Sequence, residues 1–456
     1  MATKPTVQTL DASGADIVNS IVNESPVLRS VVPAAEQTDA SVAAIGNMIA
    51  GNPTYRNEFV ETLWNRIGRV VFTSRMYSNN LAVLKKGMLD FGETVEEVFT
   101  NLAEPYQFDP DNSYANELKQ YKPDVRTAFH VMNYQKVYKT STSVARLRQA
   151  FLSMAGIVSL VNDITSKLYS AAYYDEQQVT KYMIGKAALN GLLAPIEIPA
   201  VSKTNAEDIT IAIKQASDDF EFMSREFNAA GVLNHCPKSD QFLILSNAFN
   251  SVQDVAVLAA AFNMDKAQFL GRQLRVDSFG RIDVKRLDAL FLGESWYTTP
   301  SEEELAAMDA IPCVLIDEQW AQIYDNYEEF NQTYVGDGLY WTHRYHAWKT
   351  FSESPYMDAA VFTSTEPSVT SVTVSPDSVT AAAGTTVQFS AAVETEGFQR
   401  KGVVWSATGT GTGDIVVTQD GKVTVPTTYT SAQTITVTAT SMVDGTKKDT
   451  ATITVS

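Results

Sequence analysis

Apolar side chains recur at steps of three and four residues over one long stretch of the chain, which is the period of a helix face. No proline occurs from Ser143 to Leu193, so we predict one helix from Ser143 to about Lys186. At 1.5 Å per residue this spine helix extends about 60 Å, which exceeds the width of a compact domain. The apolar stripe consists of Val144, Leu147, Phe151, Met154, Val158, Val161, Ile164, Leu168 and Ala172.

Two strand-like runs, Val70–Tyr77 and Thr94–Phe99, precede the spine helix and are joined by a middle that contains Asn79-Asn80 and Lys85–Gly87. We predict that they form an extended β-ribbon loop over residues 67–104. Such a ribbon is marginally stable alone in water, so it needs a partner surface in its own subunit or in a neighbour. Basic residues that are candidates for pairing with acidic neighbours, or alternatively for solvation at a loop tip, are Arg75, Lys85 and Lys86.

Residues 1–66 carry no long periodic segment and few large apolar side chains. Two short helical patches occur near Asp16–Val22 and Asn57–Trp64. Because so little apolar surface is available for a core, we expect this region to form an extended N-terminal arm.

The region from 206 to 364 alternates helical and strand-like stretches, which is typical of an α+β domain. Ser301 is followed three residues later by Glu304, so the segment 301–309 begins like a helix with a capping box. The helical stretches are Ala206–Phe227 and Val252–Phe262. The strand-like stretches are Phe242–Leu245, Leu274–Asp277, Cys313–Ile316, Leu339–Tyr345 and Ala359–Thr363.

The sharpest change in composition lies near 363–368, after which Ser and Thr become frequent and His no longer occurs. From 368 to 456, short alternating runs are separated by turn signals about every ten residues, which predicts an all-β sandwich. Trp405 lies in the middle of this region and is the expected core anchor. The expected strands are Ser371–Ser375, Thr386–Val393, Gly402–Ser406, Asp414–Thr418, Lys422–Val425 and Thr434–Thr440.

This C-terminal region resembles the bacterial immunoglobulin-like domains of the intimin and invasin kind. The resemblance lies in the sequences V-x-V-S-P, G-x-x-x-x-F-S-A and V-V-W-S, and it covers residues 369–456. Such domains are binding or spacing modules, and a sandwich alone does not define a function.

The length of 456 residues and the apolar content of 45% suffice for two or three packed domains and exclude a disordered chain. The 53 acidic and 35 basic side chains give a net charge of −18, which disfavours tight nucleic-acid binding. Two cysteines, Cys236 and Cys313, are too few for a disulfide scaffold and fit a reducing cytoplasm. We expect no signal peptide and no transmembrane helix, because no apolar run approaches the roughly 18 residues that span a bilayer.

Candidate catalytic and metal-binding motifs are few, because the chain has only four histidines. His343 and His346 are close in sequence, but in a strand a separation of three places them on opposite faces. Cys236 follows His235 without an identifiable base or third metal ligand. We therefore expect no enzyme, no cofactor and no metal site.

Several local sequences between about residue 60 and 362 resemble the major capsid (major head) proteins of the salasmavirus group, which are small short-tailed phages that infect Bacillus. The order of arm, ribbon, spine helix and α+β lobe also resembles the shell fold of tailed-phage capsid proteins. These phage proteins likewise end in an immunoglobulin-like domain. The matching sequences are Arg66–Val71, Gly92–Val98, Ala261–Met264, Phe269–Gly271, Asp317–Trp320, Tyr324–Asn326, Gly338–Trp341 and Tyr345–Trp348.

The resemblance implies the tailed-phage capsid shell fold, of class α+β, followed by an all-β immunoglobulin-like domain. In that fold residues 1–66 are the N-terminal arm and 67–104 the extended β-ribbon loop. Residues 105–205 are the peripheral domain with the spine helix, 206–364 the axial α+β domain, and 368–456 the immunoglobulin-like domain.

The resemblance also implies a subunit that self-assembles into pentamers and hexamers in the host bacterial cytoplasm and becomes part of the virion. Its expected partners are a scaffolding protein, a portal protein and double-stranded DNA, which an icosahedral or prolate head encloses without sequence-specific binding. The rival hypothesis is a surface adhesin that uses the C-terminal sandwich, and it predicts a secretion signal and an anchor. Assembly is expected to depend on stripe residues Leu147, Val158 and Val161.

Overall fold

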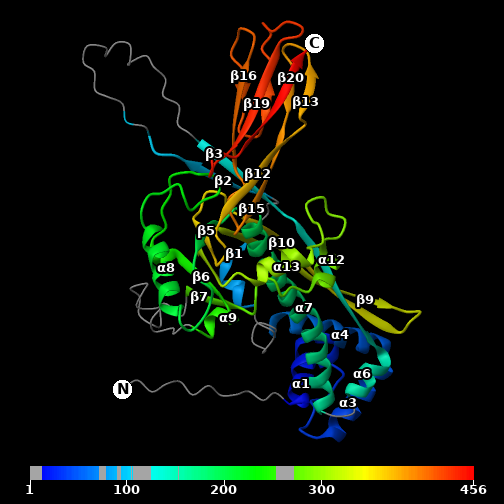
Figure 1. Ribbon diagram of the computed structural model, residues 1–456. Helices are drawn as coiled ribbons and strands as arrows, with labels where there is room; N and C mark the ends of the chain where they lie inside the picture. The colour runs from blue at the N-terminus through cyan, green and yellow to red at the C-terminus, as the bar shows by residue number, and fades with distance from the viewer. Residues whose placement is uncertain are drawn as a thin grey trace.

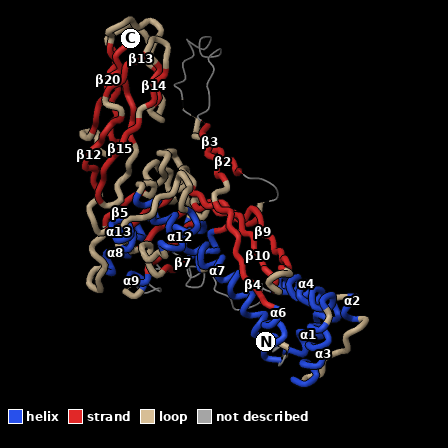
Figure 2. Tube along the Cα trace, turned by 90° about the vertical axis from the view of Figure 1, so that its right-hand side faces the viewer, coloured by secondary structure: helices blue, strands red, loops and turns tan. Residues whose placement is uncertain are grey.

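The computed structural model describes residues 13–70, 79–89, 94–103, 105, 125–151, 154–252 and 272–456. Two views at right angles show an elongated subunit, with N-terminal helices at one end and a C-terminal β-domain at the other (Figures 1 and 2). The long helix α7 (Met154–Leu189) runs through the part between them. No helix in the described ranges is both long and apolar enough to cross a membrane.

The N-terminal region consists of packed helices, so the expected extended arm is wrong for the described residues from 13 onward. The helical patches Asp16–Val22 and Asn57–Trp64 are confirmed, and Ser13 begins the first helix with a capping box to Asp16. Each helix has an apolar stripe of only a few turns, and these short stripes form a core by packing together. The helices are α1 (Gly14–Glu24), α2 (Pro26–Arg29), α3 (Asp39–Gly51) and α4 (Pro53–Val70).

The predicted spine is found as two successive helices, α6 (Val144–Ala150) and α7. Ser143 caps α6 by accepting a hydrogen bond from the amide of Arg146 at 3.2 Å. Phe151 lies in a turn between the two helices, so the expectation of one continuous helix is corrected. Helix α7 continues beyond Lys186 and ends before Gly191, whose φ of +70° is the left-handed conformation in which helices commonly end.

A four-stranded sheet lies along the spine, with the order β1-β9-β10-β4. Strands β9 and β10 form a long hairpin, and β4 pairs with β10 from Tyr340 opposite Ser143 to Lys349 opposite Tyr134. The hairpin therefore belongs to the same unit as the spine, which corrects the expected division at residues 105–205 and 206–364. The strands are β1 (Lys85–Met88), β4 (Tyr134–Ser143), β9 (Ala321–Val335) and β10 (Tyr340–Glu353).

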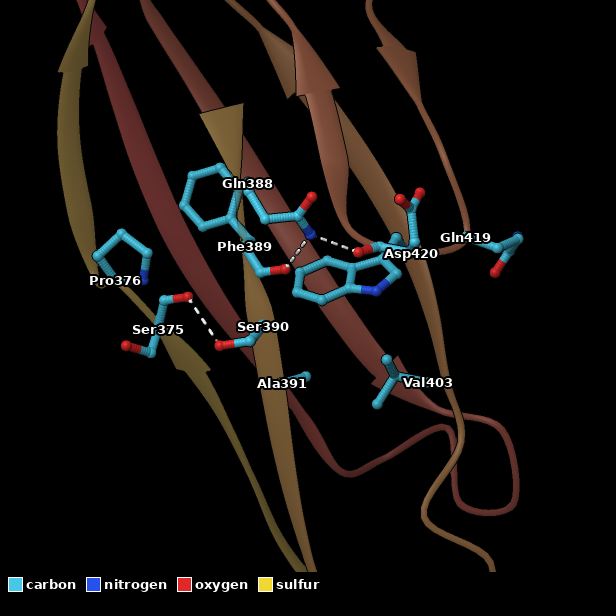
Figure 3. A pocket seen from close by; sticks show the side chains of 10 residues that line it. Ser375, Pro376, Gln388, Phe389, Ser390, Ala391, Val403, Gln419 and Asp420 are labelled. Atoms are coloured by element: carbon cyan, nitrogen blue, oxygen red, sulfur yellow. Dashed lines mark hydrogen bonds between the residues drawn. The ribbon is translucent and has the colours of Figure 1, made fainter. Parts of the chain in front are cut away.

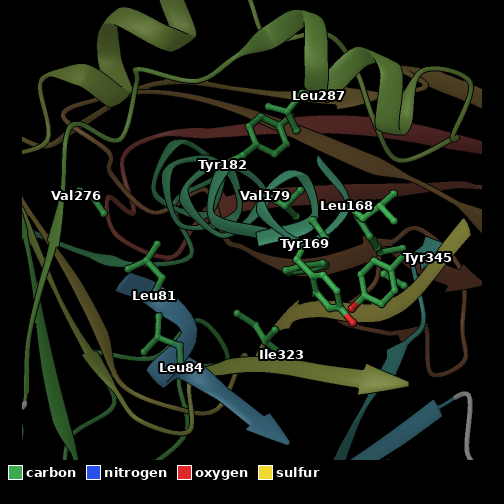
Figure 4. Packing of buried hydrophobic residues seen from close by; sticks show 14 of the residues in the cluster. Leu81, Leu84, Leu168, Tyr169, Val179, Tyr182, Val276, Leu287, Ile323 and Tyr345 are labelled. Carbon is green, nitrogen blue, oxygen red and sulfur yellow. The ribbon is translucent and has the colours of Figure 1, made fainter. Parts of the chain in front are cut away.

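Aromatic side chains fill the space between the spine and this sheet. Tyr169 of α7 lies with its ring centroid 4.8 Å from Phe330 of β9 and 5.1 Å from Tyr345 of β10. Figure 4 shows Leu168 and Tyr169 of α7 beside Tyr345, while Leu81 and other residues approach from further elements. The spine thus forms the middle layer of the main core.

A second sheet, with the order β5-β11-β8-β6-β7, lies beyond the carboxyl end of the spine. Its central strands β6, β8 and β11 consist entirely of buried residues, which explains their continuous apolar runs. Four of these five strands were predicted from the sequence, and β5 was not. The strands are β5 (Ala194–Glu197), β6 (Gln241–Ser246), β7 (Gln273–Val276), β8 (Cys313–Asp317) and β11 (Ala359–Thr363).

Short helices occur between these strands in the chain: α9 packs against β6 and β7, whereas α12 and α13 pack against the spine helix α7. The capping box predicted at Ser301 and Glu304 is confirmed at the start of α13. Helix α8 ends at Asp219 and not at Phe227, and residues 253–262 of the other expected helix lie outside the described part of the chain. The helices are α8 (Ala206–Asp219), α9 (Asn247–Asn250), α12 (Val284–Phe291) and α13 (Glu302–Asp309), with a 3-10 turn η2 (Asn80–Leu84) before β1.

The ribbon consists of β2 (Thr94–Thr100) and β3 (Val125–Val131), which pair in antiparallel register from end to end. The strand predicted at Thr94–Phe99 is confirmed, but its partner is β3. The other predicted strand of the ribbon was Val70–Tyr77. Val70 is the last residue of α4, and residues 71–78 lie outside the described part of the chain. Strand β1, within the expected ribbon loop, pairs instead with β9 of the four-stranded sheet.

The C-terminal β-domain has its own apolar core, separate from those of the preceding region. The predicted strands are present, although Thr386–Val393 is divided into two strands on either side of Phe389. Strands β13 and β20 were not predicted. The strands are β12 (Ser368–Ser375), β13 (Ser378–Ala381), β14 (Thr386–Gln388), β15 (Ser390–Glu396), β16 (Val403–Gly409), β17 (Val416–Val417), β18 (Lys422–Thr424), β19 (Thr434–Ser441) and β20 (Lys448–Val455).

Candidate assembly surfaces

The β2–β3 ribbon exposes apolar side chains on one of its faces, whereas the other face lies against the body of the subunit. Val98, Phe129 and Val131 are 57%, 61% and 56% exposed, and His130 is the one fully buried residue of the two strands. The two strands pair along their whole length, so each is hydrogen-bonded on the edge that faces the other strand. A ribbon with exposed apolar side chains lacks the covering layer that makes such a pair of strands stable in water.

We call the ribbon face that carries Glu97, Phe99, Arg126 and His130 its root, and polar contacts anchor it to the end of β10. His130 Nε2 lies 3.1 Å from Glu97 Oε2, and His130 Nδ1 lies 2.8 Å from Ser352 Oγ. The Ser354 hydroxyl donates to Glu97 Oε1 at 2.7 Å. Next to these bonds, Phe99 stacks on Tyr356 with ring centroids 5.4 Å apart. Sequence reasoning missed this cluster, because its members are distant in the chain.

Lys85 and Lys86 lie in β1 and are half-buried, so the loop-tip alternative does not describe them. Lys85 Nζ lies 2.6 Å from Asp325 Oδ2 and 3.2 Å from Glu176 Oε2. Lys86 Nζ donates to the carbonyl oxygen of Glu318 at 2.5 Å. Both lysines thus have acidic or carbonyl partners in their own chain, whereas Arg75 lies outside the described residues.

Lys85 is part of a charged cluster beneath the spine, whose centre is Lys349 of β10. Lys349 Nζ lies 2.8 Å from Glu176 Oε2 and also bonds to Asp325, and Lys349 and Glu176 are almost completely buried. Burial opposes the charged ammonium, but Glu176 and Asp325 raise the pKa of Lys349 above its usual value. Burial likewise opposes the Asp325 carboxylate, yet Lys349 and Lys85 hold its pKa below the usual value. This charge cluster ties α7, β1, β9 and β10 together.

Leu147 is buried where the spine meets the N-terminal helices. Next to it, Phe151 lies with its ring centroid 5.1 Å from that of Phe59. A Cβ atom at Gly46 would lie 2.1 Å from Phe151 Cβ, so α3 can approach this closely only with glycine at that position. The side chains of Val158 and Val161 lie outside the described part of α7.

The histidines and cysteines show the environments of structural residues. His343 points to the buried face of β10 and His346 to the other face, as the strand spacing predicts. Burial lowers the pKa of His343 to about 4, so the ring is neutral near pH 7. Burial raises the pKa of both Cys236 and Cys313. Among the described residues, no group of three His, Cys, Asp or Glu side chains is arranged to hold a metal ion.

Trp405 belongs to the core of the β-domain, as expected. It also lines a surface hollow of 460 Å³, together with Phe389, Gln388 and Asp420. Figure 3 shows that the Gln388 amide is turned toward backbone oxygens, and it donates to those of Phe389 and Asp420 at 2.9 and 2.5 Å. These bonds hold the Gln388 side chain in the wall of the hollow.

Comparisons with known proteins give one consistent family. A family model described as Phi29-like phage major capsid protein matches residues 18–363. The major capsid protein of Bacillus phage PZA is 32% identical over 90% of this chain and 86% of its own length. That of Bacillus phage B103 is 30% identical over 92% of this chain and 88% of its own length. In structure, the chain resembles one from the capsid of Staphylococcus phage Andhra, with a TM-score of 0.50 and 17% identity over 64% of this chain and 85% of that one.

Proposed function

Because the chain belongs to the family of Phi29-like phage major capsid proteins, we propose that it assembles into pentamers and hexamers that form the head of a tailed phage. As a major capsid protein it is part of the virion and forms a shell by association with copies of itself. The comparisons give no support to the adhesin hypothesis. The family consists of structural proteins, and we infer that this member has no catalytic role.

The observation that carries the proposed assembly is the uncovered apolar face of the ribbon. The exposed apolar side chains of Val98, Phe129 and Val131 need a covering layer, and a second copy of the subunit supplies it in the assembled shell. Obligate assemblies of this kind bury on the order of 2,000 Å² or more at each interface. The root contacts of His130 and Glu97 hold the ribbon in place for this contact.

The charge of the chain fits a container for DNA. At a net charge of −18 the subunit repels a phosphate backbone on average, so packaged DNA moves along the inner wall without sticking to it. We propose double-stranded DNA as the content of the shell, and a scaffolding protein and a portal protein as partners during assembly. The C-terminal β-domain is proposed to be an immunoglobulin-like domain.

Assembly can be tested by expressing the chain alone and together with the proposed scaffolding protein, and by measuring light scattering. Species of capsid size are expected, because the ribbon is covered only between subunits. Monomers under every scaffold and salt condition would contradict the proposed function. The Phe129→Asp variant provides the comparison, because it is expected to remain folded and to stay monomeric.

A further inference from the structure

The β-domain is attached to the preceding region by more than its linker. The loop between β15 and β16, residues Gly397–Lys401, lies against the carboxyl end of the spine, and we call it the docking loop. A Cβ atom at Gly191 would lie 2.6 Å from the Gln399 carbonyl oxygen and 2.9 Å from Arg400 Cα. The two backbones therefore touch where only glycine fits, and the left-handed φ of Gly191 favours glycine as well.

Phe398 at the tip of the docking loop has a φ of +63°, which is unusual for a bulky residue. Its half-buried side chain packs against the main core of the shell region. The preceding Gly397 has a φ of +61°, and a Cβ atom there would lie 2.5 Å from the Thr365 carbonyl oxygen. Such a conformation persists only when its surroundings hold it, so the docking loop is firmly seated.

Arg400 connects the docking loop to a second loop, Ser224–Asn234. Its Nη2 atom donates to the carbonyl oxygen of Glu226. The 224–234 loop is closed by two backbone hydrogen bonds between Ser224 and Asn234, of 2.9 and 3.0 Å. Asn228, fully buried inside it, donates to the Val232 carbonyl oxygen at 2.8 Å. The loop is thus a compact unit that rests on the β-domain.

The opposite side of the 224–234 loop holds the root of the ribbon. Arg126 Nη1 of β3 donates to the carbonyl oxygen of Ala230 at 2.9 Å. The Ala230 amide donates to the Pro355 carbonyl oxygen at 2.9 Å, next to Tyr356, on which Phe99 of β2 stacks. Contacts therefore run without interruption from the β-domain through this loop to both strands of the ribbon.

We propose that the β-domain is a structural support of the shell region: the docking loop holds the 224–234 loop, and the 224–234 loop holds the ribbon root at its angle. This role differs from that of a binding or spacing module on a flexible linker. The proposal rests on the proposed function only where it treats the ribbon as the assembly surface. The support itself is a property of a single subunit, so it is tested on unassembled subunits.

Hydrogen–deuterium exchange of the full-length subunit tests the support directly. In the double variant Phe398→Ala, Arg400→Ala, amides of 224–234, β2 and β3 are expected to exchange about tenfold faster than in the wild type. Strands β19 and β20, in the core of the β-domain, are expected to remain protected. The control Val404→Ala, at an exposed position of the adjacent strand β16, is expected to change none of these rates. Unchanged exchange in 224–234 of the double variant would overturn the proposal.

Substitutions at two glycines distinguish the loss of docking from a general effect of backbone strain. Gly191 and Gly293 both have positive φ, but a Cβ atom at Gly293 would meet nothing within 4 Å. Gly191→Ala is therefore expected to accelerate exchange in the 224–234 loop, and Gly293→Ala is not. Equal exchange profiles for the two variants would overturn the proposal. Failure of wild-type subunits to form shells would contradict the proposed function and leave the exchange results intact.

Discussion

The four-stranded sheet beside the spine and the β2–β3 ribbon are both built from strands that pair over long registers, but the ribbon has one apolar face that no part of its own subunit covers. Tyr345 on β10 packs against α7, and Lys349 on the same strand finds carboxylates on α7 and β9. On the ribbon, Val98 and Phe129 contact solvent although their strands pair from end to end.

The difference shows that strand pairing and side-chain burial are separate requirements. Hydrogen bonds between two strands satisfy the backbone, whereas apolar side chains need another layer to exclude water. In the sheet that layer is the spine, which belongs to the same chain. For the ribbon we propose that it comes from a second subunit, in which case the sheet determines the stability of the subunit and the ribbon determines its assembly.

Removing the ammonium group of Lys349 should destabilise the subunit most. In Lys349→Ala, the buried Glu176 and Asp325 carboxylates are left to share one cation, Lys85, and we expect the free energy of unfolding to fall by about 3 to 5 kcal/mol. Urea denaturation measures the loss. Lys422→Ala is the control, because Lys422 forms an exposed pair with Asp420 and should cost less than about 1 kcal/mol. Equal losses in both variants would show that the charge cluster does not hold the sheet to the spine.

Shortening Leu147 should have the next effect on stability. Leu147→Ala leaves a cavity between the spine and the N-terminal helices, and a loss of about 3 kcal/mol is expected in chemical denaturation. Val27→Ala, at an exposed position of α2, serves as the control and should change stability by less than about 0.5 kcal/mol.

From the sequence pattern, Val158→Asp and Val161→Asp are expected to give insoluble subunits, because each would place an unpaired charge on the apolar stripe. Normal yields of soluble protein would show that this part of the stripe is not buried.

Lowering the pH from 8 to 5 should stabilise the subunit through Asp358. Burial raises the pKa of Asp358 to about 6, above the roughly 3.9 of an unfolded chain, so the folded state binds the proton more readily. Stability is therefore gained as the pH falls through about 6 and is fully present below about 4, where it amounts to about 3 kcal/mol. Asp358→Asn should lack this dependence in thermal unfolding curves. A variant with the same pH dependence as the wild type would assign the effect to other groups.

A charge on the ribbon should have the smallest effect on the subunit and still prevent assembly. Val98→Asp changes an exposed side chain, so the free energy of unfolding should change by no more than about 0.5 kcal/mol. Shells should not form, because a carboxylate would be buried against the neighbouring subunit. Glu96→Gln, at an exposed polar position of the same strand, is the control that should assemble. Sedimentation velocity distinguishes monomers from shells, and normal assembly of Val98→Asp would place the interface elsewhere.

The sequence predicted elements whose signals are local. Ser301 and Glu304 form a capping box within four residues, and the apolar run at Cys313–Ile316 marks a buried strand. The N-terminal helices were missed because each stripe is short and is completed only by packing against the others. Strand β9 was missed because charged residues such as Asp325 lie within it, and their partner Lys349 is 24 positions away.

The candidate assembly surfaces were predictable only in part. That a ribbon needs a partner surface follows from its strand pattern. The second strand of the ribbon, β3, could not be predicted, because it is separated from β2 by a long segment of chain. The root cluster joins Glu97 and His130 to Ser352 and Ser354, and no spacing rule connects residues so far apart. The contact of the docking loop could not be predicted from the sequence either, because Phe398 packs against a core outside its own domain.

Negative-stain electron microscopy of the chain expressed together with its scaffolding protein tests most directly whether the ribbon builds a shell. Wild type and Glu96→Gln are expected to give closed shells of uniform size, whereas Val98→Asp is expected to give folded monomers. Closed shells from all three proteins, or from none of them, would contradict an assembly in which a second subunit covers the ribbon.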